Sequence, residues 1–374
     1  MPIINLQIFK TFFKSGAASG ILLLASVACS LIIANSSLAD GFAMLLEPSL
    51  VWINDGLMSI FFLLVGLEIK RELVEGELST PKKALLPVFA AFGGAIVPAI
   101  IYALLNYHSE TAAGWGIPMA TDIAFALGVI SLLGKSVPPS LKIFLAALAI
   151  ADDLIAIVVI AIFYSANIHS DMLLHAAIVF VGMMLMNRLK VTHLIFYLVP
   201  AVLLWYFVHH SGIHATIAGV LTAITIPTNK GSQASPLEKL EHALTHPVNF
   251  IIMPVFALAN TNITFEEGMF NGLFTNLGLG ILIGLFLGKP IGIGLMSWIV
   301  VKLGWGKMPH HANWRHIVGL GLLGGIGFTM SIFIALLSFG DESLEAQAKF
   351  AILITSILAG VSGYLWLKLA GKEK

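Results

Sequence analysis

Long runs of hydrophobic residues, separated by short polar segments, occupy almost the whole chain. A helix that crosses the hydrocarbon core of a membrane needs about 20 mostly apolar residues. Twelve segments meet or approach this length, of which the seventh to ninth are short. The pattern therefore predicts an all-α polytopic membrane protein with twelve transmembrane helices. The predicted spans are 16–34, 51–69, 84–105, 117–134, 141–164, 171–187, 193–208, 213–226, 247–261, 275–300, 317–338 and 346–369.

Lys and Arg residues alternate between the connecting loops. Cytoplasmic loops of membrane proteins are enriched in these residues. Of the 20 Lys and Arg residues, only Lys289 and Lys349 fall outside one alternating set of loops. The opposite loops, from 35–50 to 339–345, contain none. A miscount of spans would destroy this alternation, so we expect both termini to be cytoplasmic. The basic residues at the two ends are Lys10, Lys14, Lys368, Lys372 and Lys374.

The fourth and eleventh predicted spans are interrupted by Gly and Pro. Each interruption lies just ahead of a Thr, and the motifs that follow, TDIAFAL and TMSIFIAL, share a weak pattern. Such paired segments in two halves of a chain are typical of transporters whose inverted repeats cross as broken helices near mid-membrane. Ordinary close packing at glycine is the alternative. The residues at the interruptions are Gly116, Pro118, Thr121 and Asp122 in span 4, and Gly324, Gly325, Gly327 and Thr329 in span 11.

The composition agrees with a membrane protein and excludes several other classes. Hydrophobic residues make up 58% of the chain and charged residues 11%, whereas soluble domains carry about 25% charged residues. The formal net charge is zero, and no basic patch suggests nucleic acid as a partner. A single cysteine, Cys29, excludes a disulfide framework or a cysteine metal site. No P-loop is present, so ATP drive is not expected. No cofactor is predicted.

Four ionisable residues are predicted at membrane depth: Asp122, Asp152, Asp153 and Lys289. Each costs roughly 2.5–3.5 kcal/mol on insertion scales, so four together approach the stability of a typical fold. Function is therefore a better explanation than structure. Asp152 and Asp153 are the only polar side chains of the run 143–163. Because neighbours on a helix point about 100° apart, one can face a cation such as Lys289 while the other faces a cavity.

These groups form an oxygen-rich setting that suits a hard cation. Three carboxylates and one ammonium have a formal charge of −2, which one sodium ion raises to −1 and two protons raise to zero. The Thr121 hydroxyl and backbone carbonyls of a broken helix add neutral oxygen ligands. Burial and mutual repulsion favour protonated carboxylates, so protons can compete with sodium for one site.

The sequence resembles the NhaA family of bacterial sodium/proton antiporters. Of the matching motifs, ATDIAFALGV combined with the double Asp is the most specific. The motifs occur in the expected order over nearly the whole chain: FFLLVGLEIKREL (61–73), ATDIAFALGV (120–129), LKIFLAALAIADDL (141–154), GIHATIAGV (212–220), LEHAL (240–244), LGKPIGI (287–293) and GGIGFTMSIFIA (324–335).

The resemblance implies roles for single residues. It implies that Asp122 and Asp153 bind sodium and protons, with Thr121 beside them. It also implies that Asp152 pairs with Lys289 and that this pair breaks and reforms during exchange. A second group is implied to sense pH: Glu68, Arg71, Glu72, Glu241, His242 and His214, the last at the outward end of the eighth span.

The resemblance further implies a secondary transporter and not an enzyme. It implies one transmembrane domain over 1–374, with a core bundle of spans 3–5 and 10–12 and an interface of spans 1, 2, 8 and 9. The expected activity is electrogenic export of Na+ or Li+ in exchange for H+, activated with rising pH. The expected location is the lipid bilayer of the bacterial inner membrane.

The segment 36–49 is the longest and most apolar of the outward loops. Its Asp40-Gly41 pair is a hairpin-type turn signal. Two interpretations are open, a plain surface loop and a small hairpin that pairs two subunits into a homodimer.

Two other functions compete with antiport. An intramembrane aspartyl protease needs two Asp on facing helices, but Asp122 follows Ala120-Thr121 and not a G-x-G-D motif. A buried Lys would also oppose a proton-sharing dyad. A cation channel is the other alternative. Broken helices around one site favour alternating access, and saturable, proton-coupled flux would exclude a channel.

Overall fold

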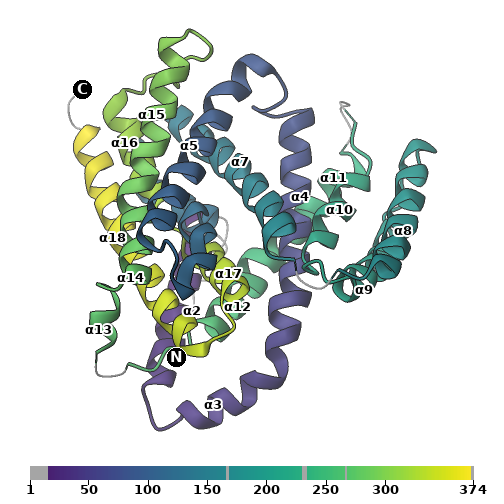
Figure 1. Ribbon diagram of the computed structural model, residues 1–374. Coiled ribbons are helices and arrows are strands. Elements are labelled where there is room, and N and C mark those ends of the chain that lie inside the picture. The colour runs from purple at the N-terminus through teal and green to yellow at the C-terminus, as the bar shows by residue number, and fades with distance from the viewer. Residues whose placement is uncertain (1–15, 166–167, 230–233, 266–267, 372–374) are drawn as a thin grey trace, which may run out of the picture. The chain divides into compact units, whose positions relative to one another are not determined.

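The computed structural model describes residues 16–165, 168–229, 234–265 and 268–371. Every regular element in these ranges is a helix (Figure 1). The predictions made for Lys10, Lys14, Lys372 and Lys374 lie outside the described residues. The prediction of an all-helical membrane protein is confirmed.

Each of the twelve predicted segments contains a helix. By length and composition, seven described helices can cross a membrane. They are Trp52–Val74, which includes α4 (Met58–Val74), α5 (Pro81–Leu105), α7 (Pro139–Phe163), α8 (Ser170–Arg188), Pro236–Asn260, Asn276–Lys302 and α18 (Glu342–Ala370). Two bent pairs correspond to spans 4 and 11. Shorter apolar helices among the described residues are Ala18–Ala34, within α2 (Gly16–Ala34), and α9 (Ile195–His210). The predicted eighth span contains only the nine-residue α10 (Ile217–Thr225).

The chain divides into two compact units. Unit 1 comprises Met1–Ala39, Leu85–Asp152 and Asn260–Lys374, and unit 2 comprises Asp40–Ala84 and Asp153–Ala259. In unit 2, α4 packs on α10, and α9 packs on α8 and α10. In unit 1, α18 packs on α16 (Trp314–Gly324), which also packs on α15 (Lys289–Lys302). The predicted division into core and interface spans stays a prediction.

Two of the long helices widen into a π turn just before a proline. In Asn276–Lys302, the π turn η6 (Gly284–Gly288) precedes Lys289-Pro290, and Lys289 N–H donates to Gly284 O. In Pro236–Asn260, η5 (Val248–Ile252) precedes Met253-Pro254. A proline has no N–H and its ring clashes with the carbonyl four residues earlier. The π turn accommodates this misfit without ending the helix.

The ninth span begins earlier than predicted, at Pro236 with α11 (Pro236–Pro247). Ser235 caps this helix, because its side chain accepts from Glu238 N–H while the Glu238 side chain accepts from Ser235 N–H. A Ser that is followed directly by Pro, with a Glu three residues after the Ser, is a sequence signature of a helix start. The search for apolar runs missed this signature because the segment 236–246 is largely polar.

The segment 36–49 does not form a hairpin. It contains a helix, α3 (Ala39–Leu46), followed by a 3₁₀ turn over Glu47–Ser49. Asp40 lies in the first turn of α3, where its charge favours the helix N-terminus. The residues after Gly41 are mostly good helix formers. The hairpin interpretation is therefore wrong, whereas the pairing of two subunits through the segment 36–49 stays a prediction.

Glycines allow α5 and α15 to approach closely near Lys289. A Cβ atom on Gly292 of α15 would collide with the carbonyl oxygen of Gly93 on α5, and the reverse holds as well. We predict that Gly292→Ala lowers the thermal unfolding midpoint in detergent, because overpacking costs about 1–3 kcal/mol. Gly294→Ala is the matched control, since nothing lies within 4 Å of its Cβ position. Equal midpoints for the two variants would contradict the prediction.

Candidate ion-binding site

The breaks of the two bent pairs meet within unit 1. The first pair is η3 (Glu110–Met119) with α6 (Ile123–Leu132), bent by 43°, and the second is α16 with α17 (Phe328–Ser338), bent by 46°. Asp122 N–H donates to Ile326 O at 2.7 Å, and the Thr121 hydroxyl donates to Gly324 O at 2.9 Å. An unsatisfied backbone group in lipid costs several kcal/mol. Each break therefore satisfies backbone groups that the other leaves free.

Asp122 lies at the N-termini of two helices. Its Oδ1 caps α6 by accepting from Phe125 N–H at 3.0 Å. Its Oδ2 accepts from the N–H and the hydroxyl of Thr329, in the first turn of α17. Both helix ends carry partial positive charge, so one buried carboxylate balances two dipoles. Thr329 was predicted only as part of an interruption, and its bond to Asp122 was not predicted.

Lys289 forms a buried ion pair with Asp152. Lys289 Nζ lies 2.7 Å from Asp152 Oδ2, and both side chains are at most 1% exposed. The same ammonium donates to the Thr121 hydroxyl at 2.9 Å. Hydrogen bonds thus run from Asp152 on α7 through Lys289 on α15 and Thr121 to Gly324 at the break of the second pair. This chain connects the ionisable groups directly to the broken helices.

One carboxylate oxygen of Asp152 takes no part in the ion pair with Lys289. Among the described residues, Asp152 Oδ1 is buried and accepts no hydrogen bond. Asp153, the next residue on α7, is only 3% exposed. A buried carboxylate oxygen without a donor is costly, and a proton or a hard cation would relieve that cost. The residues present therefore suit a small monovalent cation as substrate.

The predicted pH-sensing residues of α4 and α11 gather in unit 2. Arg71 Nε donates to both carboxylate oxygens of Glu241 at 3.0 Å, and Arg71 Nη1 lies 3.3 Å from Glu72. Glu68, one turn earlier on α4, interacts electrostatically with Glu241. His242 follows Glu241 and is exposed. Two carboxylates thus contact one guanidinium, and the carboxylate of Glu68 interacts with it electrostatically.

His214 does not belong to that cluster. Its Nε2 lies 3.6 Å from Asp55 Oδ1, and its Nδ1 lies 2.9 Å from the Thr216 hydroxyl. Asp55 precedes Arg71 by 16 residues in one membrane-spanning helix, which corresponds to about 24 Å. Ionisable groups therefore occupy both ends of this helix. Asp55 was missed because it was taken as part of the entry to the second span.

Lys70 is a second residue that sequence analysis did not single out. Its ammonium donates to Ile224 O at 2.6 Å and to Ile226 O at 2.5 Å. These carbonyls lie at the C-terminus of α10, where the last carbonyls have no partner within the helix. A cation also complements the negative end of the helix dipole. Lys70 therefore fixes the end of this short helix to α4.

Comparison with known proteins agrees with this architecture. The family model described as Na+/H+ antiporter 1 matches residues 10–367. The chain belongs to this antiporter family. Its members are secondary transporters, so the fold described above is that of a multi-pass membrane transporter.

Similar curated proteins cover almost the full chain. Na(+)/H(+) antiporter NhaA 2 of Flavobacterium johnsoniae is 62% identical, over 100% of this chain and 95% of its own length. Na(+)/H(+) antiporter NhaA of Flavobacterium psychrophilum is 50% identical, over 96% of each chain. Among solved structures, the sodium proton antiporter MjNhaP1 of Methanocaldococcus jannaschii covers 95% of this chain and 99% of its own, with 14% identity and a TM-score of 0.48.

The ion pair predicts a measurable coupling in stability. Removing one partner of a buried pair costs about 3–5 kcal/mol, because the other charge stays buried and unpaired. Asp152→Asn and Lys289→Gln should each lower the unfolding midpoint, and the double variant should lose less than the sum. The exposed pair Lys83–Glu77, at 3.5 Å, is the control and should couple by less than about 1 kcal/mol. Additive losses for Asp152 and Lys289 would show that the two do not interact.

Proposed function

We propose that the protein exports Na+ in exchange for H+ at the site built around Asp152, Asp153 and Lys289. The observation that supports this proposal is the buried Asp152–Lys289 ion pair, whose second carboxylate oxygen lacks a donor. Asp153 lies beside it on the same helix and supplies the second negative charge. Two carboxylates and the Thr121 hydroxyl offer the oxygen ligands that a hard cation prefers.

The charges of the site suggest how protons and sodium exchange. Without sodium, the Asp152–Lys289 pair is neutral and Asp153 holds a proton. Sodium bound between the two carboxylates replaces the proton of Asp153 and competes with Lys289 for Asp152. An ammonium that loses its buried partner is strongly disfavoured, so Lys289 releases a proton as well. Two protons then exchange for one sodium ion, which makes transport electrogenic. Li+, a smaller hard cation, fits the same ligands.

In this proposal Asp122 holds the broken helices together. Its two oxygens already accept three hydrogen bonds, and its charge balances the N-termini of α6 and α17. Its sequence-based assignment as a sodium ligand stays a prediction. Asp122→Asn can separate the two roles. Loss of a sodium ligand would weaken the apparent sodium affinity, whereas loss of a structural bond would lower the unfolding midpoint.

Asp153→Asn tests the site directly. We expect the variant to lose Na+-dependent proton movement, because it removes both a ligand charge and a titratable proton. The measurement is sodium-induced dequenching of a ΔpH-sensitive dye in everted vesicles at matched expression. Asp171→Asn, at the exposed start of α8, is the control and should exchange normally. In wild-type vesicles, a membrane potential alone should drive sodium movement. Normal exchange in Asp153→Asn, or no response to potential, would contradict the proposal.

We also propose that the cluster around Arg71 adjusts activity to cytoplasmic pH, with higher activity as pH rises. Glu68 and Glu241 interact electrostatically with Arg71, so they titrate as a group, and their protonation would weaken the contacts between α4 and α11. Competition between Na+ and H+ at the transport site also makes the rate depend on pH. The two causes differ in one respect, since only competition disappears at saturating sodium.

The pH dependence of Glu241→Gln separates these causes. We expect its activation midpoint to differ from that of wild type even at saturating sodium, since the variant removes one charge bound to Arg71. Exchange rates should be recorded against pH at several sodium concentrations. Glu77→Gln is the control, because Glu77 contacts Lys83 and not Arg71. A midpoint that moves only with sodium would exclude Glu241 from pH sensing.

The positions of Lys and Arg support the orientation that we propose, with both termini in the cytoplasm and the protein in the bacterial inner membrane. Arg71 and Glu241 then face the cytoplasm, while Asp55 and His214 lie toward the outside. A homodimer stays a prediction, and α3 is the element of the segment 36–49 that could contribute to it. Cysteine accessibility in intact cells and in everted vesicles would establish the orientation.

A further inference from the structure

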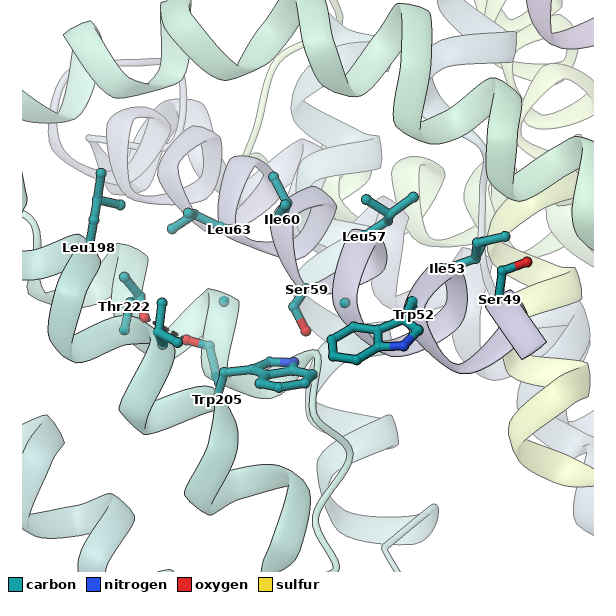
Figure 2. Close-up of a pocket in the computed structure, with 15 residues that line it drawn as sticks. Ser49, Trp52, Ile53, Leu57, Ser59, Ile60, Leu63, Leu198, Trp205 and Thr222 are labelled. Atoms are coloured by element: carbon teal, nitrogen blue, oxygen red, sulfur yellow. Dashed lines mark hydrogen bonds between the residues drawn. The ribbon is translucent and has the colours of Figure 1, made fainter.

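Three π turns occur in the described part of the chain, and one of them directly precedes a buried ionisable residue. The first, η2 (Trp52–Leu57), is followed by Met58 and borders an apolar pocket within unit 2 (Figure 2). The second, η5, is followed by Met253. The third, η6 (Gly284–Gly288), is followed by Lys289, whose ammonium belongs to the proposed transport site. A π turn inside an α-helix is rare and frequently marks a functional site.

The turn η6 leaves one backbone carbonyl without a donor from the following turn of its helix. Lys289 N–H donates to Gly284 O, five residues earlier, and not to Leu285 O, four residues earlier. The next residue, Pro290, has no N–H to donate. Leu285 O therefore stays available as a second acceptor for the N–H of Lys289. Lys289 can thus change its acceptor without losing a backbone hydrogen bond.

The same π turn lies against both bent helix pairs of unit 1. A Cβ atom on Gly284 would collide with the ring of Pro118 in η3. On the other side, a Cβ atom on Gly325, at the break after α16, would collide with the carbonyl oxygen of Leu285. Because packed interiors leave no slack, a movement at either break is transmitted to the π turn. The segment ahead of Lys289 is therefore placed to connect the breaks with the ion pair.

We propose that η6 is a hinge that moves Lys289 off Asp152 when sodium binds. A π turn contains one residue more than an α turn. When this extra residue passes to the C-terminal side of Lys289, its N–H takes Leu285 O as acceptor. The side chain then advances by one residue position, about 100° around the helix axis, and leaves Asp152 and Thr121. This inference rests on the proposed function, in which sodium competes with Lys289 for Asp152.

Deletion of Leu287 tests the hinge. This residue lies within η6, and its side chain is exposed on the helix surface. Without it the π turn becomes an α turn, in which Lys289 N–H still reaches Gly284 O, now four residues earlier. The ion pair with Asp152 should persist, but Lys289 has no extra residue with which to move.

We expect the deletion variant to lose sodium-dependent proton movement in everted vesicles by about tenfold or more, because the hinge no longer moves. Its thermal unfolding midpoint should not fall below that of Leu287→Ala. Leu287→Ala is the matched control, since it removes the same side chain but keeps the chain length, and it should exchange at the rate of wild type. Lys289→Gln should still lower the midpoint in the deletion background, which would show that the ion pair is intact there.

Hydrogen–deuterium exchange gives a second measurement, on the wild-type protein itself. A π turn that moves along the helix breaks backbone hydrogen bonds one after another, and such local opening raises amide exchange. Sodium should therefore raise deuterium uptake in the segment 285–293. The segment 247–253 around η5 is the control and should not respond, because no ionisable residue follows that π turn. If the deletion variant does not fold, this measurement alone decides.

The results distinguish the hinge from the proposed function. Normal exchange in Asp153→Asn would overturn the proposed site, and the hinge with it. An inactive Asp153→Asn together with a folded, fully active deletion variant would overturn the hinge alone. Deuterium uptake over 285–293 that does not respond to sodium, in a protein that exchanges sodium for protons, would also overturn the hinge alone.

Discussion

Two interrupted helices in an apolar medium can exist only if their free backbone groups find partners inside the protein, and here they find them in each other. Asp122 and Thr121 at one break bond to Ile326 and Gly324 at the other. A carboxylate then accepts from the starts of both following helices. The rest of unit 1 depends on this mutual satisfaction, because without it neither break would be tolerated at membrane depth. The breaks in turn create the polar surroundings that ionisable side chains need.

The need for partners inside the protein also explains why the buried ammonium of Lys289 is tolerated, and how a competing cation could open its ion pair. Its ammonium has Asp152 and Thr121 as partners, and its stem lies beside Gly94, where glycine allows α5 to approach closely. A buried ion pair contributes little net stability, since desolvation offsets the attraction. A pair of this kind can therefore be opened by a competing cation at moderate cost. The spare oxygen of Asp152 is the place where such competition can begin.

Much of this arrangement could be predicted from the sequence, and the reasons are physical. Apolar runs reveal spans because lipid admits few polar side chains, and Asp152, Asp153 and Lys289 stand out against that background. The Gly and Pro interruptions predicted the two bends correctly. The contacts of Thr329 with Asp122 and of Lys70 with α10 could not be predicted, because nothing in the sequence marks these residues as partners. Their chemical types, a hydroxyl in an apolar helix and a lysine at a helix end, have many ordinary uses.

The errors have a physical cause as well. The segment 36–49 was taken as loop or hairpin because Asp40-Gly41 is a turn signal, yet Asp is equally at home in the first turn of a helix. The early start of α11 was missed because its capping box lies outside the apolar run. In the first case a local signal at a helix end was misinterpreted, and in the second it was overlooked. Span detection from hydrophobicity finds what the membrane requires, whereas helix ends, which lie near water, are decided by hydrogen bonds to a few backbone groups. The residues proposed to respond to pH, Arg71 with Glu241 and Asp55 with His214, lie at such helix ends.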